Sequence, residues 1–260
     1  MKMKELMQAI GTLAPVSYAM DWDNVGLLVG DPEKEVRKIY LALDMTTQVM
    51  ERAAAAGCDT ILTHHPMLFS PVKRITADDF MGRRIMGLIS HGINYYAMHT
   101  NYDVAVMGRL CSDRLGLTYE APLEITGEAE GRPIGIGSIG SPKSPVTLGA
   151  LAALVRVRFE LPAIRVFGDP EAVITRAAMC PGSGKGMDRE ALAGGAQVLI
   201  TGDVDHHYGL DSLEKGLMMI DAGHHGLEHV YVDHMAGWLG EHFPELAVIG
   251  DENRSPFSVI

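Results

Sequence analysis

The sequence predicts an α/β fold with two lobes, each a mostly parallel sheet covered by helices, and a metal site between them at the strand carboxyl ends. Short apolar or β-branched runs alternate with segments of helical periodicity, which is typical of parallel sheets. This alternation of strand and helix patterns is interrupted once, from about residue 120 to 145, where Gly, Pro, Ser and Glu are frequent. We therefore expect lobes over residues 1–124 and 125–260, with the last strand able to return to the first lobe.

The expected elements of the first lobe follow from the spacing of apolar residues. Leu6, Met7, Ile10 and Leu13 recur at helical spacing and predict an N-terminal helix over 4–13. A turn-rich stretch over 21–26 precedes an apolar run over 27–30. After it we expect strands over 39–43, 60–63 and 93–98, separated by helices over 46–55 and 78–90.

In the second lobe the same alternation restarts after the Gly- and Pro-rich stretch. We expect helices over 146–157 and 226–237, and strands over 163–167, 172–179, 198–201, 217–220 and 246–249.

Charge and composition exclude several classes of function. Among 260 residues, 22 Lys and Arg stand against 33 Asp and Glu, a net charge of −11. Sequence-independent nucleic-acid binding needs the opposite balance, because basic side chains must neutralise phosphates. The sequence contains no run of about 18 apolar residues, the length that a membrane-spanning helix needs. The three cysteines are odd in number and form no CxxC pair, and no signal peptide is visible, so we expect a cytoplasmic protein.

Polar side chains gather where five of the expected strands end. In chain order these residues are Asp44; His64 and His65; His99 and Asp103; Asp203, Asp205, His206 and His207; and Asp221, His224, His225, Glu228 and His229. Because the carboxyl ends of parallel strands share one edge of a sheet, we expect these clusters to converge. Imidazole together with carboxylate suits Zn, Fe, Mn, Co or Ni, whereas Ca and Mg prefer oxygen ligands.

Each cluster taken alone has a simpler interpretation. His224 and Glu228 lie four apart, on one face of a helix, but an exposed helix pair has the same spacing. Asp103 is equally placed to cap a helix, and His99 to be a core histidine or a group that orients a ligand. The joint placement of the clusters at strand ends is what favours a metal site.

A glycine-rich segment from Cys180 to Gly186 resembles a phosphate-binding loop but does not match it. Met179 stands where the first Gly of that motif belongs, and Gly186 stands where Ser or Thr would follow Lys185. Backbone N–H groups of such a turn can still bind an anion, so a weaker ligand role stays open.

Five short motifs resemble the GTP cyclohydrolase 1 type 2 family, also called Nif-three-like dinuclear-metal proteins. The motifs are Asp23-Asn24-Val25-Gly26-Leu27, Thr63-His64-His65-Pro66, His99-Thr100-Asn101-Tyr102-Asp103, Thr201-Gly202-Asp203, and Asp221-Ala222-Gly223-His224 with Glu228. The resemblance runs in order from about residue 20 to 230. It implies a two-lobed fold, two divalent metal ions per chain and a homohexamer, in the short form that lacks an inserted domain. It also implies that His64 and Asp103 hold one ion, His65 and His224 the other, and that Glu228 bridges them.

The resemblance implies a hydrolase in which metal-bound hydroxide attacks a small nucleotide-like substrate, with GTP ring opening as the reaction. His99 and Asp203 are then candidate catalytic residues that move protons, and Lys73, Arg74 and Lys185 are candidates to bind the triphosphate. The chain departs from the family at Asp205, where members often have Lys. The alternative is a non-catalytic protein that stores, delivers or senses metal at the same centre, and a phosphoesterase is a third hypothesis.

Overall fold

The structure is a computed structural model that describes residues 1–259, and it divides into two compact units. The first unit contains residues 1–102 and 231–253, and the second contains 103–230 with the C-terminal residues from 254. The expected boundary after residue 124 lies inside the second unit, so Asp103 belongs to the second unit and not to the first lobe. The reason is local: Asp103 opens a helical stretch that continues into a helix packed against the sheet of the second unit.

The sheet of the first unit has five strands in the order β1 (Gly26–Val29), β4 (Asn94–Ala97), β3 (Thr60–Thr63), β2 (Lys38–Ala42) and β15 (Ala247–Gly250). The four strands from β4 to β15 run parallel, and β1 lies antiparallel to β4. The last strand thus joins the sheet of the first unit. Its parallel centre reads as near-continuous apolar sequence because it is buried on both faces.

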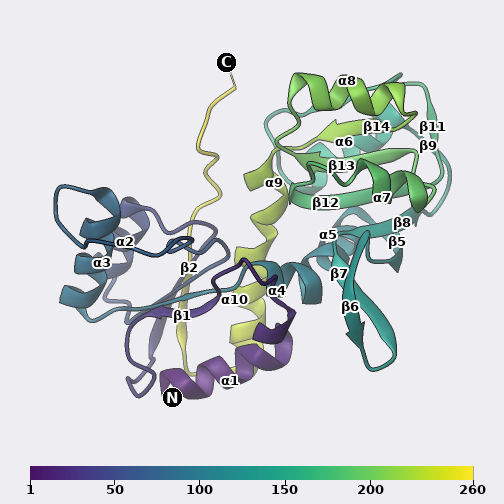
Figure 1. The fold of residues 1–260 in the computed structure, drawn as a ribbon. Helices are drawn as coiled ribbons and strands as arrows, with labels where there is room; N and C mark the ends of the chain where they lie inside the picture. The colour runs from purple at the N-terminus through teal and green to yellow at the C-terminus, as the bar shows by residue number, and fades with distance from the viewer. Residues whose placement is uncertain (260) are drawn as a thin grey trace. The chain divides into compact units, whose positions relative to one another are not determined.

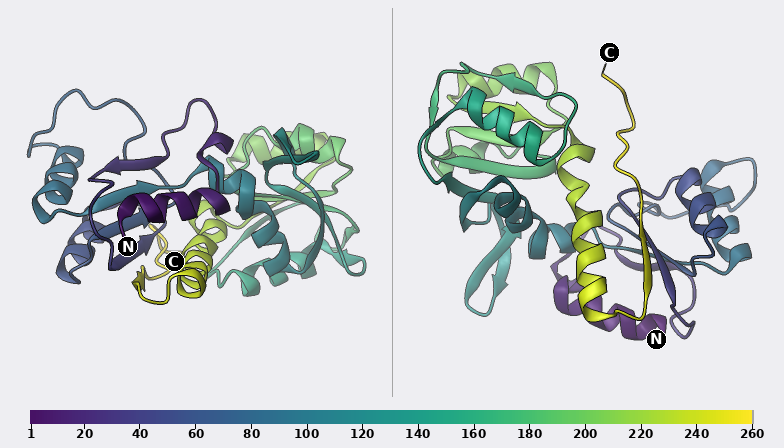
Figure 2. Two further views of the ribbon diagram at one scale, coloured as in Figure 1. Left: turned by 90° about the horizontal axis from the view of Figure 1, so that it is seen from below. Right: turned by 180° about the vertical axis from the view of Figure 1, so that it is seen from behind.

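Helices cover both faces of this sheet. On one face, α2 (Thr47–Ala55) and α3 (Phe80–His91) pack against alternate strand residues such as Tyr40, Ile61 and Tyr95. The helices α1 (Met3–Leu13) and α10 (Val230–His242) lie on the other side (Figures 1 and 2). The alternation follows from the strand period of two, which turns successive side chains to opposite faces.

The second unit is built on a six-stranded sheet. Its order is β10 (Arg165–Phe167), β14 (Met218–Asp221), β13 (Val198–Gly202), β12 (Ala177–Ser183), β8 (Ser138–Pro142) and β5 (Leu117–Ala121). The central strands β12, β13 and β14 are parallel, and the outer pairs are antiparallel. A two-stranded ribbon joins β9 (Val146–Thr147) to β11 (Val173–Ile174).

The helices of this unit are α5 (Gly108–Leu115), α6 (Leu148–Arg158), α7 (Asp188–Ala193), α8 (His206–Glu214) and α9 (His224–Glu228). Of these, α5 and α9 pack against β12, and α7 contributes Ala191 to the core formed with β12, β13 and β14 (Figure 1). Three short helical turns complete the chain: η1 (Val16–Tyr18), α4 (Thr100–Tyr102) and the π-helical η2 (Asp103–Met107).

The Gly- and Pro-rich stretch near residue 130 is a β-hairpin. Its strands β6 (Glu124–Ala129) and β7 (Arg132–Ile136) are joined by Glu130 and Gly131, both with positive φ. Two such residues form the type I′ turn whose twist suits a hairpin. The composition that suggested a lobe boundary therefore marks a tight turn within the second unit.

The predicted α/β class with two helix-covered sheets is confirmed. Most expected elements lie within two or three residues of their predicted ends. Among the helices of residues 1–259, none combines the length and the apolar character that crossing a bilayer requires.

Asp251 secures the end of β15 to the neighbouring strand and helix. Its carboxylate accepts a hydrogen bond of 2.7 Å from the Tyr40 hydroxyl and pairs with the Arg52 guanidinium at 2.8 Å. Burial, together with the Asp251 carboxylate, raises the pKa of Tyr40 to about 12. The bond therefore persists across the physiological pH range.

We predict that Asp251→Ala lowers the free energy of unfolding by about 1–3 kcal/mol, because it removes two hydrogen bonds to one charged group. Urea unfolding measures the change. Asp113→Ala, at an exposed position of α5, is the matched control and should shift stability by no more than about 0.5 kcal/mol. Equal effects of the two substitutions would contradict the anchoring role.

Candidate metal centre

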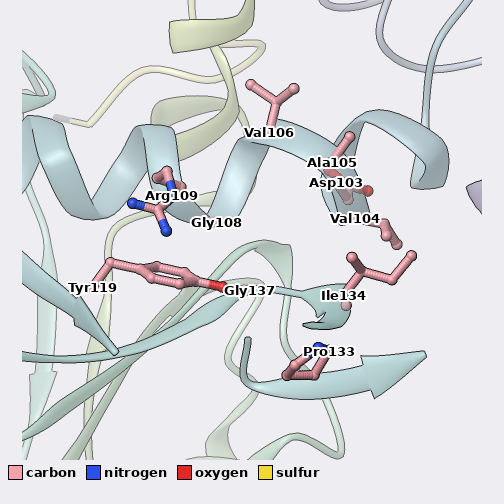
Figure 3. A pocket seen from close by; sticks show the side chains of 11 residues that line it. Asp103, Val104, Ala105, Val106, Gly108, Arg109, Tyr119, Pro133, Ile134 and Gly137 are labelled. Carbon is pink, nitrogen blue, oxygen red and sulfur yellow. The ribbon is translucent and has the colours of Figure 1, made fainter. Parts of the chain in front are cut away.

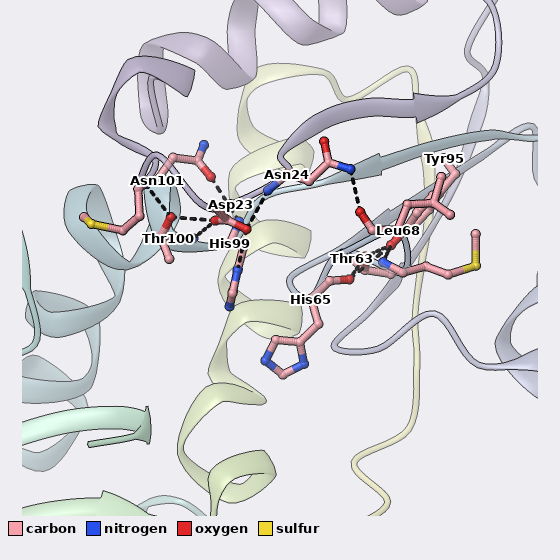
Figure 4. A network of polar contacts seen from close by, with 11 residues as sticks. Asp23, Asn24, Thr63, His65, Leu68, Tyr95, His99, Thr100 and Asn101 are labelled. Carbon is pink, nitrogen blue, oxygen red and sulfur yellow. Dashed lines mark hydrogen bonds and ion pairs between the residues drawn. The ribbon is translucent and has the colours of Figure 1, made fainter. Parts of the chain in front are cut away.

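Two adjacent histidines leave the carboxyl end of β3 on a backbone that is fixed by hydrogen bonds. The Thr63 hydroxyl donates to the carbonyl oxygen of His65 at 2.8 Å, and the buried Tyr95 hydroxyl donates to the same oxygen at 3.0 Å. Tyr95 in turn accepts the backbone N–H of Met67 at 2.7 Å (Figure 4). The turn that carries His64 and His65 is thereby tied to β4 at the Tyr95 side chain.

Carboxylates fix the imidazoles of His65 and His99. His65 Nδ1 donates to Asp44 Oδ1 at 2.8 Å, and His99 Nδ1 donates to Asp23 Oδ1 at 2.9 Å. A carboxylate at Nδ1 orients the ring and leaves Nε2 as the atom that can bind a metal, which is the usual arrangement around metal-ligating histidines.

Asp23 is held by more than His99. Its other oxygen accepts the backbone N–H and the hydroxyl of Thr100, and its side chain is fully buried (Figure 4). Burial acts to raise the pKa of Asp23, but the hydrogen bonds from His99 and Thr100 outweigh it and lower the pKa to about 2. The carboxylate is therefore ionised at neutral pH.

Three histidines of the first unit form one cluster. The ring centroid of His64 lies 5.0 Å from that of His65 and 5.4 Å from that of His99. One ring nitrogen from each lies within 4.8 Å of the others, so the three could hold a metal ion. His64 is completely buried, and the other two are partly exposed.

The second unit has its own group of ligand atoms on α9. His224 and Glu228, one helical turn apart, bring Nε2 and Oε2 to 3.0 Å. The opposite ring atom, His224 Nδ1, lies 2.8 Å from Asp203 Oδ2. Asp203 follows β13 with φ at +57°, a left-handed conformation that Asp tolerates better than most residues.

Asp103 extends this group. One of its carboxylate oxygens lies within 4.8 Å of an oxygen of the buried Glu228. Asp103 also begins the π-helical turn η2, a type of turn that is frequent at functional sites.

Burial raises the pKa of the Cys111 and Cys180 thiols, and the nearby charges of Asp103 and Glu228 raise it further, so both cysteines stay protonated.

Two glycines at strand ends make room for α9. A Cβ at Gly182, where φ is +74°, would lie 2.2 Å from Glu228 Oε1 and 3.5 Å from His224 Nε2. A Cβ at Gly202 would lie 2.3 Å from the backbone nitrogen of His224. Glycine is therefore required at both positions for Glu228 and His224 to approach the ends of β12 and β13.

Among the residues predicted from sequence, the first unit brings His64, His65 and His99 together. The second unit brings Asp103, His224 and Glu228 together with Asp203. Sequence reasoning did not pair His65 with Asp44 or His99 with Asp23: Asp44 was expected only among the strand-end clusters, and Asp23 only as part of a motif. Their hydrogen bonds span 21 and 76 residues of sequence, and no local pattern marks such pairs.

Of the predicted anion-binding cations, Lys185 is engaged within the second unit. Its ammonium lies 2.9 Å from the carboxylate of Asp205. Lys73 and Arg74 lie in the exposed loop between β3 and α3, and among residues 1–259 no carboxylate lies within 4.0 Å of either.

A cavity of about 120 Å³ lies beside Asp103 in the second unit (Figure 3). Its wall includes the η2 turn, the hairpin residues Pro133 and Ile134, and Tyr119. The Arg109 guanidinium stacks 4.2 Å above the Tyr119 ring. The cavity is thus lined mainly by polar surface, with the Asp103 carboxylate and the Arg109 guanidinium among the lining groups.

The model of the Duf34/NIF3 (NGG1p interacting factor 3) family matches residues 1–256. The chain belongs to the Duf34/NIF3 family. The resemblance inferred from the five motifs is thereby confirmed. Relatives named GTP cyclohydrolase 1 type 2 homolog include one from Clostridium acetobutylicum, 37% identical over 88% of this chain and 85% of its own length. Another, from Clostridium perfringens, is 35% identical with both chains covered completely.

Solved structures of other proteins share the fold of this chain. A Staphylococcus aureus hypothetical protein superposes with a TM-score of 0.90 at 29% identity, covering 100% of this chain and 99% of its own. Reduced HcgD from Methanocaldococcus jannaschii gives 0.82 at 27% identity, covering 96% and 97%.

We predict that Asp23 stabilises the metal-free protein in a pH-dependent way. Its pKa is depressed in the folded state, so the stabilisation is complete above about pH 4 and is lost as the pH falls through about 2. The stability of the native chain relative to Asp23→Asn should therefore decrease by about 2 kcal/mol over that range, as measured by urea unfolding in steps of pH. Asp113→Asn is the control, and a pH-independent difference between the native chain and Asp23→Asn would contradict the argument.

Gly182→Ala should lower metal affinity on the order of tenfold or more, because the added Cβ displaces Glu228. Gly186→Ala is the matched control: Gly186 lies in the turn that follows β12 with φ at +95°, but a Cβ there would meet nothing within 4 Å. Both variants should lose about 1 kcal/mol to backbone strain, whereas only Gly182→Ala should lose metal. Titration of the metal-free proteins with Zn²⁺ measures the affinities, and equal affinities in the two variants would show that Gly182 serves only the turn.

Proposed function

We propose that the protein is a dinuclear metal-dependent hydrolase that acts on a nucleotide-like substrate, with opening of the GTP purine ring as its reaction. One observation carries the proposal: three imidazoles are oriented at Nδ1 by carboxylates, each beside further ligand atoms. His65 pairs with Asp44, His99 with Asp23, and His224 with Asp203. This donor chemistry fits divalent ions of the zinc and iron type.

Chain connectivity supports joining the two groups of ligands in one centre. The His64 ring contacts the rings of Tyr102 and Tyr231, with centroids 6.0 and 5.5 Å away. These tyrosines are the last and first residues of the first unit at its two junctions with the second. Asp103 follows Tyr102 directly, and Glu228 precedes Tyr231 by three residues, a span of at most about 11 Å.

In this proposal, His64 and Asp103 would hold one ion and His65 and His224 the other, and the Glu228 carboxylate would be a ligand shared between them. Divalent ions held in pairs supply Lewis-acid activation of water for hydrolysis near neutral pH. The metal identity stays open among Zn, Fe, Mn, Co and Ni, because this donor set accepts all of them.

The other two predicted residues receive different roles. His99 has Nδ1 engaged by Asp23, so its Nε2 is the atom able to exchange a proton with a bound substrate. Asp203 contacts the imidazole of His224, which makes it a positioning residue for that ligand. We retain Lys73 and Arg74 as the candidates for binding phosphate, since Lys185 already pairs with Asp205.

We also propose that the protein acts in the cytoplasm as a homohexamer. The three cysteines are buried and form no disulfide, which suits a reducing compartment. The hexamer follows from the family resemblance, and the mass of the native protein in solution tests it.

His65→Ala and Glu228→Ala should each lower the bound metal per chain, because each removes a proposed ligand. Elemental analysis of the purified proteins measures the content. His242→Ala is the control, since this exposed histidine stacks on Trp238 within α10. Full retention of two ions per chain in both ligand variants would overturn the assignment.

Incubation of the metal-loaded native protein with GTP tests the reaction. If the protein is a hydrolase, the native protein and His242→Ala should consume GTP. His65→Ala and Glu228→Ala should leave GTP intact. Retention of GTP, with rapid exchange of the bound ions with a chelator, would instead identify a metal-handling protein.

A further inference from the structure

Two large aromatic side chains lie exposed beside the histidine cluster of the first unit. Trp22 is 59% exposed and Phe69 is 52% exposed. Their ring centroids lie 5.7 Å apart, and they lie 6.0 and 6.3 Å from the ring of His99. Trp22 precedes the carboxylate that orients His99, and Phe69 lies four residues beyond His65.

The loops that carry these rings are fixed in place. Asp23 is buried and bonded to His99 and Thr100, which holds the backbone next to Trp22. Asn24 Nδ2 donates to the carbonyl oxygen of Leu68, so the Trp22 loop is bonded directly to the Phe69 loop (Figure 4). Two exposed aromatics on tethered loops form a preorganised surface, because little further ordering is needed when a ligand binds.

The two rings leave much of each other uncovered. Their planes are inclined by 48°, so neither ring stacks flat on the other. By contrast, Trp238, the other tryptophan of the chain, stacks on His242 at 4.6 Å and 25°. Single exposed apolar residues scattered over a surface are common and have no special meaning. Exposed apolar surface concentrated beside polar groups is typical of a ligand-binding site.

We propose that Trp22 and Phe69 form a stacking platform for the planar heteroaromatic ring of a substrate, such as a purine base, placed next to the imidazoles of the metal centre. The proposal rests on the hydrolase function proposed above for that centre. Aromatic faces attract any base through stacking, and they offer no hydrogen bonds that a sugar or phosphate would need. Phosphate recognition is therefore left to cations such as Lys73 and Arg74, which the same β3–α3 loop carries beyond Phe69.

The fluorescence of Trp22 reports on this platform directly. In Trp238→Phe, Trp22 is the remaining tryptophan, and we expect guanosine monophosphate to quench its emission saturably. Ribose 5-phosphate, which lacks the base, should leave the emission unchanged. Should Trp238→Phe fold poorly, the difference between the native protein and Trp22→Leu gives the same signal.

Phe69→Leu in the same background should weaken guanosine monophosphate binding on the order of tenfold, the usual loss when one stacking ring is removed, while the metal content is unchanged. Phe80→Leu is the matched control: Phe80 is 51% exposed in the same unit but contacts the guanidinium of Arg84 in α3. It should bind as the parent does.

Three results would overturn the platform: no quenching by guanosine monophosphate, equal binding by Phe69→Leu, or a Trp22 emission that changes with protein concentration alone. The last would assign the aromatic pair to a contact between copies of the chain. Failure here is distinguishable from failure of the proposed function. If His65→Ala loses metal but guanosine monophosphate does not quench Trp22 in Trp238→Phe, the platform alone is overturned. If guanosine monophosphate quenches Trp22 but the native protein binds no metal, the metal centre alone is overturned.

Discussion

The hydrogen bond between a carboxylate and a histidine Nδ1 is the interaction on which the candidate centre depends. It joins His65 to Asp44, His99 to Asp23 and His224 to Asp203. Each bond fixes the ring orientation and the tautomer, so that Nε2 can serve as a ligand or exchange a proton. Some of the acidic residues of the chain thus orient imidazoles at this site, in addition to contributing to its net charge.

The folds of the two units explain how these pairs form. In the first unit, Asp44 follows β2 and His65 follows β3, and these strands are parallel neighbours whose carboxyl ends meet. In the second, Asp203 follows β13 and His224 follows β14, again parallel neighbours. One topological rule therefore places a carboxylate beside an imidazole in each unit, and Gly182 and Gly202 supply the space that the second pair needs.

Much of this could be predicted from sequence, because strand ends and strand order are encoded locally. The runs over 60–63 and 217–220 are short and consist of apolar or β-branched residues, so the strand ends that carry the candidate ligands were recognisable. The partner of His99 was not, since Asp23 reaches it through a loop 76 residues away. The division into units also differs from the expected one, because a Gly- and Pro-rich composition marks a hairpin turn as readily as a linker. The exposure of Trp22 and Phe69 depends on tertiary packing and has no signature in composition.

Nitrogen-15 NMR of the histidine side chains tests the central claim most directly. In protein titrated with Zn²⁺, His65 and His224 should keep a proton on Nδ1, bonded to Asp44 and Asp203, while their Nε2 resonances shift as the metal binds. Resonances that place the proton on Nε2 and the metal on Nδ1 would contradict the account, as would Zn²⁺ binding that leaves both rings unchanged.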